Sequence, residues 1–420
     1  MTNLPKSRMA ASFWIVLAVA LVAYHLALVF SGLVPNLISR PLHMAFILPF
    51  ALVFDAGTTL RRITGSILAA LGVAAALWVA FKSDVLGDQY GFIESEFQLA
   101  VAVTLLLVVL ETARRVIGWP LPLVAALALL YGLFGQYIPG EFGHSGTPVA
   151  SFFGTLTIAE GGIWGTLTGV SVSVVAIFVI FGAVLNAGEA GQGFMNVAAA
   201  AAGRLKGGAA KVSVLSSALF GSISGSASAN VASTGAITLP AMTKLGYPKR
   251  LAAAVEAVAS SGGQIMPPLM GAGAFVMVEL TGVPYTGIMA AAALPALLYF
   301  VAVWVGINAY ARRFALQSIA EADRPALREV VITSLFFLVP FTVLLWGMFI
   351  AQFTPEYSAA MAILAATVLL FFNAQLTFLP RQIADRLASA VLNAARQVAL
   401  IASIILCASI IIGVLSITGL

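Results

Sequence analysis

The stretch GSISGSASAN, residues Gly221 to Asn230, decides how this chain folds. It lies in the middle of Val212 to Met242, an apolar segment that is too long for a single membrane crossing of about 20 residues. Its residues are small and polar where a spanning helix should be apolar. We therefore predict that residues 212–242 enter a membrane and return as a re-entrant hairpin. Non-helical backbone is tolerated at that depth only when it is buried in protein or lines a wet cavity, so the tip marks a cavity.

The composition places the rest of the chain in a membrane as well. Of the 420 residues, 61% are hydrophobic and 9% are charged, and the mean hydropathy is +1.04. A soluble globular domain has about a quarter of its residues charged. The chain is therefore predicted to be an all-α, polytopic integral membrane protein. Its first apolar run is too long for a signal peptide and no small-residue cleavage site closes it, so we expect it to be retained as a helix.

Apolar stretches recur along the chain, mostly at the length of about 20 residues that crosses a hydrocarbon core. Besides the hairpin, we predict about eleven spanning helices. They are Phe13 to Val34, Leu42 to Ala56, Thr64 to Phe81, Gln98 to Ala113, Trp119 to Ile138, Thr168 to Gly188, Leu251 to Leu280, Thr286 to Tyr310, Val330 to Ile350, Tyr357 to Phe378 and Val398 to Leu420.

The basic residues support the hairpin, because Lys and Arg accumulate in the short loops on the cytoplasmic side. With the N-terminus inside and a hairpin at residues 212–242, 19 of the 21 basic residues fall on the cytoplasmic side. If the segment crossed once instead, the ten basic residues after it would change sides and nine would remain inside. The charge distribution therefore favours the hairpin and a cytoplasmic N-terminus.

The segment after the hairpin, residues 251–280, is interrupted by SSGGQIMPP, residues Ser260 to Pro268. Two glycines in this run favour unwinding, and two prolines free carbonyl groups on the preceding turn from helical bonding. Unwound carbonyls and helix C-termini suit Na⁺, whereas helix N-termini suit a carboxylate. Together with the serines and the asparagine of the hairpin tip, the broken helix predicts an ion-coupled site near the midplane of the membrane.

Simpler interpretations compete with this one. Small residues also allow close helix packing, and Gly or Pro kinks are common in membrane helices, but the two motifs occur in consecutive segments, which favours a joint site. Glu256 has two interpretations as well. A carboxylate inside a membrane is a functional group by default, yet this one lies within two turns of Lys249 and Arg250 and could form an interfacial ion pair. The sequence leaves the role of Glu256 open.

No catalytic centre can be assembled from these residues. The single cysteine, Cys407, lies in an apolar run, and His25, His43 and His144 are scattered. Neither a zinc site, nor a catalytic dyad, nor a phosphate-binding loop is present in the sequence. We therefore expect a protein that is not an enzyme, has no cofactor, does not bind nucleic acid and does not use ATP as its energy source.

Two consecutive stretches resemble a known family. GSISGSASANVASTGAITLPAM, residues 221–242, and KLGYPKRLAAAVEAVASSGGQIMPPLMGAGAFVM, residues 244–277, are similar to the large membrane subunit of tripartite ATP-independent periplasmic (TRAP) transporters. The form that the chain resembles is the fused permease, in which a four-helix small subunit precedes the large one and which commonly partners a TAXI-type binding protein. The resemblance is specific over residues 161–310, and over residues 13–138 it rests on helix number and position.

The resemblance implies an elevator-type importer with two inverted repeats in the inner membrane of a bacterium. Residues 1–139 would form the small-subunit scaffold, residues 140–397 the first repeat of the large subunit with its scaffold helices, and residues 398–420 the start of the second repeat. A periplasmic TAXI-type binding protein would deliver a small organic acid, and Na⁺ would be the coupling ion, with H⁺ as the alternative. The ion and substrate site would map onto Ser222, Ser224, Gly225, Ser226, Asn230, Gly262, Gly263, Pro267 and Pro268.

The family also has a second hairpin and a second broken helix, which complete the substrate cavity. The sequence stops at Leu420 in a helix that resembles the opening of this second repeat, so we expect a chain truncated in that repeat. Two alternatives remain open at this point. One is an anion or dicarboxylate symporter that works without a binding protein, and the other is a truncated membrane scaffold that transports nothing.

Overall fold

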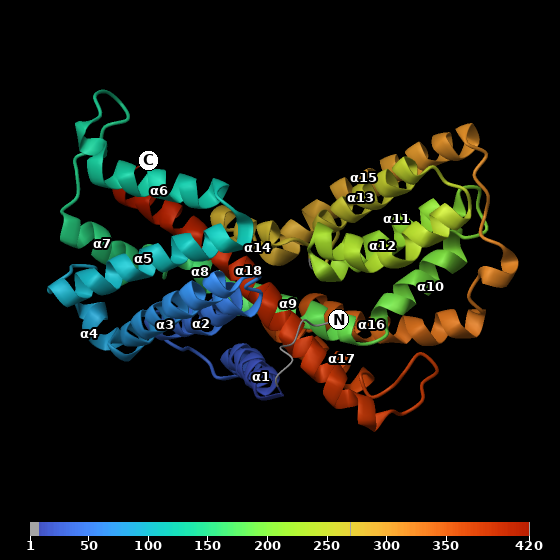
Figure 1. Cartoon of the computed structure of the whole chain (residues 1–420), viewed down its shortest axis with the longest axis horizontal. Helices are drawn as coiled ribbons and strands as arrows, with labels where there is room; N and C mark the ends of the chain where they lie inside the picture. Colours follow the sequence, from blue (N-terminus) through green and yellow to red (C-terminus); the bar gives the residue numbers. More distant parts are fainter. Residues whose placement is uncertain (1–7, 269, 420) are drawn as a thin grey trace. The chain divides into compact units, whose positions relative to one another are not determined.

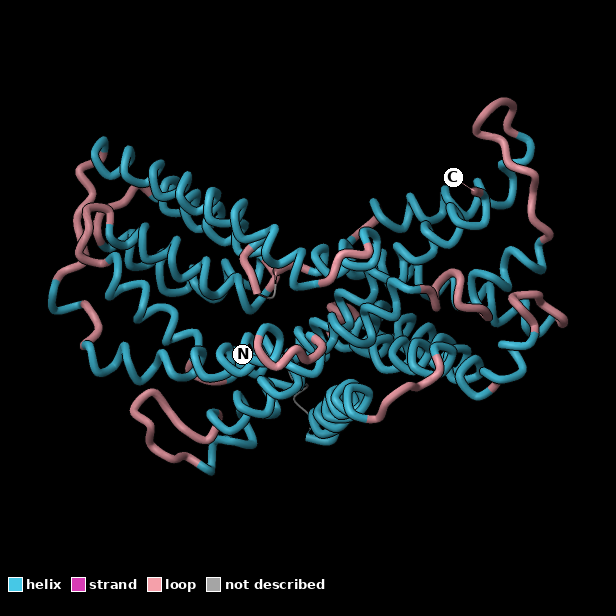
Figure 2. The backbone as a smooth tube through the Cα atoms, turned by 180° about the vertical axis from the view of Figure 1, so that it is seen from behind, coloured by secondary structure: helices cyan, strands magenta, loops and turns pink. Residues whose placement is uncertain are grey.

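The computed structural model describes residues 8–268 and 270–419, and these residues form helices joined by loops. Figures 1 and 2 show helices throughout, and the described residues contain no strand beyond an isolated bridge between Phe372 and Phe378. The chain divides into two compact units. Unit 1 takes in the described residues up to Ala176 and those from Leu392 onward, and unit 2 is Ile177–Val391.

Unit 1 is built from the N-terminal helices and the end of the last helix. A π-helical turn, Phe50–Phe54, extends α2, and another, Ser171–Val175, follows α8. The α-helices are α1 (Arg8–Phe30), α2 (Asn36–Pro49), α3 (Thr59–Phe81), α4 (Ser83–Asp88), α5 (Glu96–Ile117), α6 (Pro120–Phe134), α7 (Val149–Thr157), α8 (Thr166–Val170) and the later part of α18 (Ile383–Thr418).

Unit 2 contains the hairpin and the broken helix. Within it, α11, α12 and α13 pack against one another, α15 packs against α11 and α13, and α10 packs against α11 and α16 (Figure 1). The helices are α9 (Ala176–Ala187), α10 (Ala190–Ala202), α11 (Gly208–Ser224), α12 (Ala227–Lys244), α13 (Lys249–Gly262), α14 (Ala272–Thr281), α15 (Tyr285–Arg313), α16 (Leu327–Phe349), α17 (Pro355–Leu369) and the beginning of α18.

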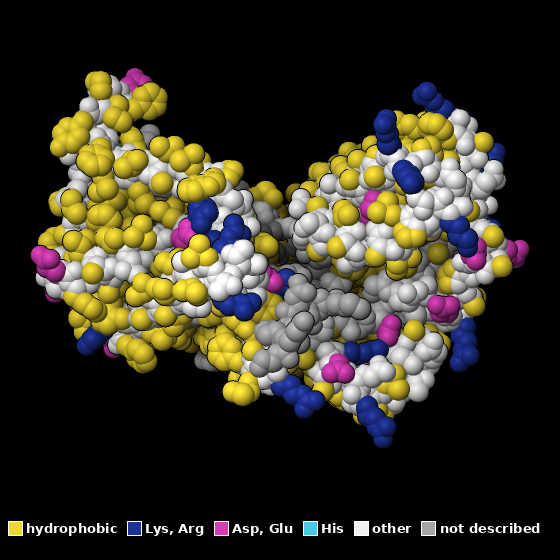
Figure 3. All heavy atoms as spheres, viewed as in Figure 1, with side chains coloured by type: hydrophobic (Ala, Val, Ile, Leu, Met, Phe, Trp, Pro, Cys, Tyr) yellow, Lys and Arg dark blue, Asp and Glu magenta, His cyan; other side chains and the backbone are white. Residues whose placement is uncertain are grey.

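Long apolar helices with exposed apolar faces agree with a membrane as the solvent. Within residues 8–268 and 270–419, eight helical segments are long and apolar enough to cross a membrane. Side chains on their surfaces are large and apolar, for example Leu123, Leu127 and Leu130 on α6 and Leu297 and Val301 on α15, each about half exposed. In Figure 3 yellow, apolar side chains cover the visible face of α6. Water would not tolerate this surface, but lipid would.

The fold contains a helical hairpin and an interrupted helix at the residues where the sequence predicts the hairpin and the broken helix, and the re-entry of the hairpin into a membrane stays a prediction. Residues 212–242 form two antiparallel helices, α11 and α12, that pack on each other and turn at Gly225. Residues 251–280 form α13, a 3-10 turn at Gly263–Ile265, an irregular stretch, and then α14. One expected boundary differs, because α18 begins at Ile383, well before the predicted start at Val398. Its first turns carry Asp385 and Arg386, so the helix is longer than its apolar part.

Buried polar side chains join the helices of unit 1. His25 on α1 donates from Nδ1 to the carbonyl of Leu21, which leaves its Nε2 to accept from Nδ1 of His43 on α2 at 2.8 Å. His43 Nε2 in turn lies 3.1 Å from the hydroxyl of Ser171. At the surface, Asp55 pairs with Arg396 of α18 at 2.9 Å. Segments distant in sequence are thus held together by directional bonds.

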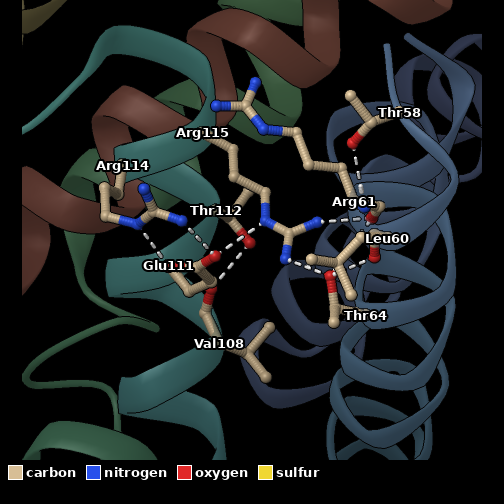
Figure 4. A network of polar contacts seen from close by, with 9 residues as sticks. All are labelled: Thr58, Leu60, Arg61, Thr64, Val108, Glu111, Thr112, Arg114 and Arg115. Carbon is tan, nitrogen blue, oxygen red and sulfur yellow. Dashed lines mark hydrogen bonds and ion pairs between the residues drawn. The ribbon is translucent and has the colours of Figure 1, made fainter. Parts of the chain in front are cut away.

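A cluster of charged residues fastens α5 to α3. Figure 4 shows Glu111 between Arg114 and Arg115, with contacts of 2.6 and 2.7 Å. Arg115 also reaches across to α3, where it donates to the carbonyl of Arg61 and to the hydroxyl of Thr64, each at 2.9 Å. Arg114 bonds Glu111 within its own helix and is more exposed, at 31% against 10% for Arg115.

The two arginines therefore make a matched pair of variants. We expect Arg115→Ala to lower the free energy of unfolding by about 2 kcal/mol, because it breaks charge-assisted bonds between two helices. Arg114→Ala should cost about 0.5 kcal/mol, as for an exposed pair on one helix. Thermal and denaturant unfolding of the purified variants in detergent measures both. Equal losses would show that the contact to α3 adds no stability.

Candidate functional site

The hairpin tip is a tight turn because a helix C-cap is followed at once by a helix N-cap. Gly225 ends α11 in the left-handed conformation, with φ +58°, and its N–H donates to the carbonyl of Gly221 at 3.1 Å. This is a conformation that glycine adopts without strain. Ser226 then begins α12, and its hydroxyl accepts from the N–H of Ala229 at 3.3 Å. The chain thus turns from α11 into α12 over two residues, Gly225 and Ser226.

The broken helix leaves an irregular stretch between α13 and α14. The 3-10 turn that starts at Gly263 ends α13, and the N–H of Gly271 returns to the carbonyl of Gln264 at 2.7 Å. Between these points the Pro267–Pro268 peptide bond is cis, and the hydroxyl of Tyr285 on α15 donates to the carbonyl of Pro268. The chain is therefore not helical at residues 266–268 and at Met270.

Hairpin and break meet through their backbones. A Cβ atom on Gly221 would lie 2.2 Å from the Cα atom of Gly263, and one on Gly225 would lie 2.3 Å from the carbonyl oxygen of Met270. Distances under 3.0 Å do not occur for real Cβ atoms, so both positions need glycine. Asn230, which is fully buried, lies at the same place and donates from Nδ2 to the carbonyl of Ser217 at 2.8 Å.

The predicted residues divide into those that share this contact and those that do not. Gly225, Asn230 and Gly263 lie where the hairpin meets the break, and Ser226 caps the adjoining turn. Ser222 is buried, but its hydroxyl donates to the carbonyl of Leu219 in its own helix at 2.6 Å.

The remaining predicted residues lie around this centre. Gly262 faces the ring of Tyr299 on α15, which a Cβ atom would approach to 2.3 Å. The hydroxyl of Ser224 lies 3.5 Å from the carbonyl of Ser226, so it stays at the tip. Pro267 and Pro268 belong to the irregular stretch itself, where Tyr285 holds the carbonyl of Pro268. The direct contact of hairpin and break is thus made by a subset of the predicted site.

Glu256 is buried beside this contact and is held by hydroxyl groups. It is 1% exposed, and none of the ion pairs of the described residues includes it. Of the two interpretations that the sequence left open, the interfacial pair with Lys249 or Arg250 is not formed in the described part of the chain, since both basic side chains are exposed at the start of α13. Four hydroxyls contact its carboxylate instead. They belong to Ser213 at 2.8 Å, Thr234 at 2.5 Å, Ser260 at 3.2 Å, and Thr238.

These hydroxyls continue into the hairpin as a connected polar network. Thr234 also lies 2.8 Å from the carbonyl oxygen of Asn230 and 3.5 Å from its side-chain oxygen Oδ1. The hydroxyl of Ser217 lies 3.2 Å from that of Thr234 and 3.4 Å from that of Ser260. Asn230 Nδ2 also reaches the carbonyl of Ser260 at 3.4 Å. The network links α11, α12 and α13.

Our reading of the sequence missed most members of this network. A signal was present, because the polar residues recur every fourth position and so share one face of each helix. The three runs are Ser213 and Ser217 on α11; Asn230, Thr234 and Thr238 on α12; and Glu256 and Ser260 on α13. Three such faces in adjacent helices indicate a shared polar centre.

The site offers oxygen ligands. Within the described part of the chain, no group of three or more His, Cys, Asp or Glu side chains could hold a metal ion. The carbonyl groups of residues 266–268 and of Met270, and the hydroxyls of Ser224 and Ser226, are hard ligands of the kind that Na⁺ prefers in broken membrane helices. The arrangement suits binding of a small hard cation better than acid–base or nucleophilic chemistry.

Comparison with known proteins identifies similar chains. The family model of the tripartite ATP-independent periplasmic transporter, DctM component, matches residues 104–420. The C4-dicarboxylate TRAP transporter large permease protein DctM of Pseudomonas aeruginosa is 30% identical over 204 residues, which are 47% of this chain and 46% of that protein. The ectoine TRAP transporter large permease protein TeaC of Halomonas elongata is 24% identical over 270 residues, 64% of this chain and 60% of TeaC.

A shorter match covers the isethionate TRAP transporter permease protein DctMQ of Oleidesulfovibrio alaskensis. It is 35% identical over 97 residues, which are 23% of this chain and 15% of that protein. The chain spans about half the length of the curated relatives that it matches over longer stretches, such as the Pseudomonas protein.

The contact of Gly221 with Gly263 can be tested by adding one methyl group. We expect Gly221→Ala to lower the free energy of unfolding by at least about 1–3 kcal/mol, because the new atom meets backbone rather than a flexible side chain. Gly306→Ala is the control, since nothing lies within 4 Å of a Cβ atom there and alanine favours the helix. Thermal unfolding of both variants measures this difference. An unchanged Gly221→Ala protein would contradict the close approach.

Proposed function

Because the chain belongs to the DctM component family of tripartite ATP-independent periplasmic transporters, we propose that it is the permease of a Na⁺-coupled importer of small organic acids. The family assignment makes the chain a component of a multi-pass membrane transporter. The coupling ion, the class of solute and the mechanism are our proposal. One observation carries it, namely the contact between the hairpin tip at Gly225 and the irregular stretch that interrupts α13 and α14.

Electrostatics supports a cation at this contact. Helices α11 and α13 both end there, at Ser224 and Gly262, and a helix C-terminus carries partial negative charge on its unbonded carbonyls. The irregular residues 266–268 and Met270 add carbonyls that are free of helical bonding. These groups suit an ion that carries a single positive charge and needs several oxygen ligands. Na⁺ is the ion that meets this description, and its binding would order the tip and the break together.

The same contact supports an anionic solute. Helices α12 and α14 begin there, at Ala227 and Ala272, and the N–H groups of a helix N-terminus favour a carboxylate. The relatives are named for C4-dicarboxylates, ectoine and isethionate, which are small polar solutes with acidic groups. We therefore place a small organic acid next to the cation. Each ligand would lower the cost of burying the other's charge.

The family name implies a periplasmic solute-binding protein as partner. We propose that a TAXI-type binding protein delivers the solute, that the permease lies in the bacterial inner membrane with its N-terminus in the cytoplasm, and that the hairpin and broken helix move as an elevator. The fused arrangement, with residues 1–139 as the small-subunit block, is part of the same proposal.

Sodium binding gives the first test, because it needs no knowledge of the solute. At a Na⁺ concentration ten times the Kd, binding to the folded state adds about 1.4 kcal/mol of stability. Titration of the purified protein with NaCl, with choline chloride at equal ionic strength as reference, should therefore raise its Tm. Ser226→Leu and Asn230→Leu should remove this Na⁺-specific increase. Thr243→Leu, at an exposed position on the same helix, should retain it.

Uptake into proteoliposomes tests the rest of the proposal. With the binding protein present, labelled organic acids should accumulate only under an inward Na⁺ gradient, and Ser226→Leu should abolish the accumulation while protein levels stay unchanged. Accumulation without the binding protein would point instead to a symporter that works alone. Equal uptake by Ser226→Leu and the unaltered protein would contradict the assignment of the Na⁺ site to the hairpin tip.

A further inference from the structure

We propose that Glu256 is a proton-binding site of the permease, and that its carboxylate takes up one proton as the hairpin and the broken helix change state. The inference rests on the proposed function, since it treats this region as the moving ion site. It adds a second ionic species, H⁺, and a residue that holds it. The geometry of the hydroxyl groups around Glu256 carries the argument.

Among the described residues, Glu256 forms no ion pair with a basic side chain. A carboxylate inside a membrane protein is costly unless a basic group, an ion or a proton neutralises it. Helix α11, which packs on α13, carries Lys211, but its ammonium group lies over the ring of Trp304, 5.1 Å from the centroid.

The helices that pack around Glu256 carry other charged and titratable side chains. Lys244, Lys249 and Arg250 are exposed at helix ends, and the hydroxyl of Tyr299 donates to the carbonyl of Val258 at 2.7 Å. In the described part of the chain, none of these side chains, on α12, α13 or α15, forms an ion pair or hydrogen bond with the carboxylate. The remaining titratable groups on α15 are Tyr285, Tyr310, Arg312 and Arg313, and α10 carries none.

The distances around the carboxylate fit hydrogen bonds rather than a bound metal ion. Ser213 and Thr234 donate directly to its two oxygens, at 2.8 and 2.5 Å. A cation held between such oxygens would keep each of them about 2.3–2.6 Å from itself, as in Ca²⁺ sites, and would push hydroxyl and carboxylate apart. Because O–H groups make these contacts, a proton can bind the carboxylate with only a rotation of a hydroxyl group.

Thr234 allows the site to hold either charge state. In the ionised state its hydroxyl donates to Oε1 of Glu256. When a proton from water binds Oε1, the new O–H donates to Oγ1 of Thr234, and the hydroxyl proton of Thr234 turns to the carbonyl of Asn230, 2.8 Å away. Ser213 and Thr238 continue to donate to Oε2. One proton is gained, and each hydroxyl keeps an acceptor.

This rearrangement reaches the proposed Na⁺ site through one residue. The carbonyl and side-chain oxygens of Asn230 are the alternative acceptors for Thr234, and Nδ2 of the same side chain holds the carbonyl of Ser217. A Cβ atom on Gly263 would lie only 2.6 Å from Nδ2 of Asn230, so this side chain is in close contact with the broken helix. The protonation state of Glu256 therefore changes a hydrogen bond to the main-chain carbonyl of Asn230, the residue whose side chain touches the broken helix.

Infrared difference spectroscopy of the purified protein in lipid reads this proton directly. When the pH is lowered, the unaltered protein should gain C=O bands of protonated carboxylic acids, shifted in D₂O, and one of these bands should belong to Glu256. Glu256→Gln, which keeps the shape of the neutral acid, should lose that band completely. Glu321→Gln, at an exposed position, should retain it.

A second variant keeps the test decisive if Glu256→Gln fails to fold. Thr234→Val preserves the carboxyl group and the side-chain shape, and it should displace the band because the acid loses the hydroxyl that takes its proton. Identical difference spectra for Glu256→Gln and the unaltered protein would overturn the proton site. A band that Thr234→Val leaves unchanged would overturn it as well. The infrared measurement needs neither Na⁺ nor solute. If the unaltered protein shows the band of Glu256 but its Tm does not rise with NaCl, the proposed function is overturned and the proton site is not.

Discussion

The contact between the backbones of Gly221 and Gly263 is the constraint on which the rest of unit 2 depends. Two helical segments can approach to this distance only when neither carries a side chain at the crossing. The approach brings the turn at Gly225 against the irregular stretch at Met270, and each covers backbone groups of the other. Backbone without helical bonds can then lie inside a membrane protein, because it is buried in protein rather than exposed to lipid.

The polar network behind this contact explains how three small-residue helices stay in register. Helices α11, α12 and α13 share an apolar cluster that includes Val214, Met242 and Val255. The carboxylate of Glu256 adds directional bonds to hydroxyls on all three helices. A charged acceptor makes these bonds about twice as strong as neutral ones. The same feature that holds the hairpin thus makes it sensitive to the charge of a single side chain.

Unit 1 is held together in a different manner. Its helices are long and apolar, and a few polar contacts fix which of them are neighbours. The chain of bonds from His25 through His43 to Ser171 has one direction, because the carbonyl of Leu21 can only accept. Arg115 adds a second link, from α5 to α3. Such contacts are specific where apolar helix surfaces in lipid are not.

The sequence by itself determined the membrane class, the turn at residues 221–230, the break at residues 260–268 and the family, since each depends on local composition, on glycine and proline, or on a contiguous motif. The roles of the predicted site residues remain predictions. What Glu256 contacts was decided only by the tertiary structure. In sequence its nearest charged neighbours are Lys249 and Arg250, whereas in the fold it faces Ser213, 43 residues away, and Thr234. The physical reason is that a hydrogen bond depends on which helix faces pack together, and this packing is set by the distant contact of Gly221 with Gly263.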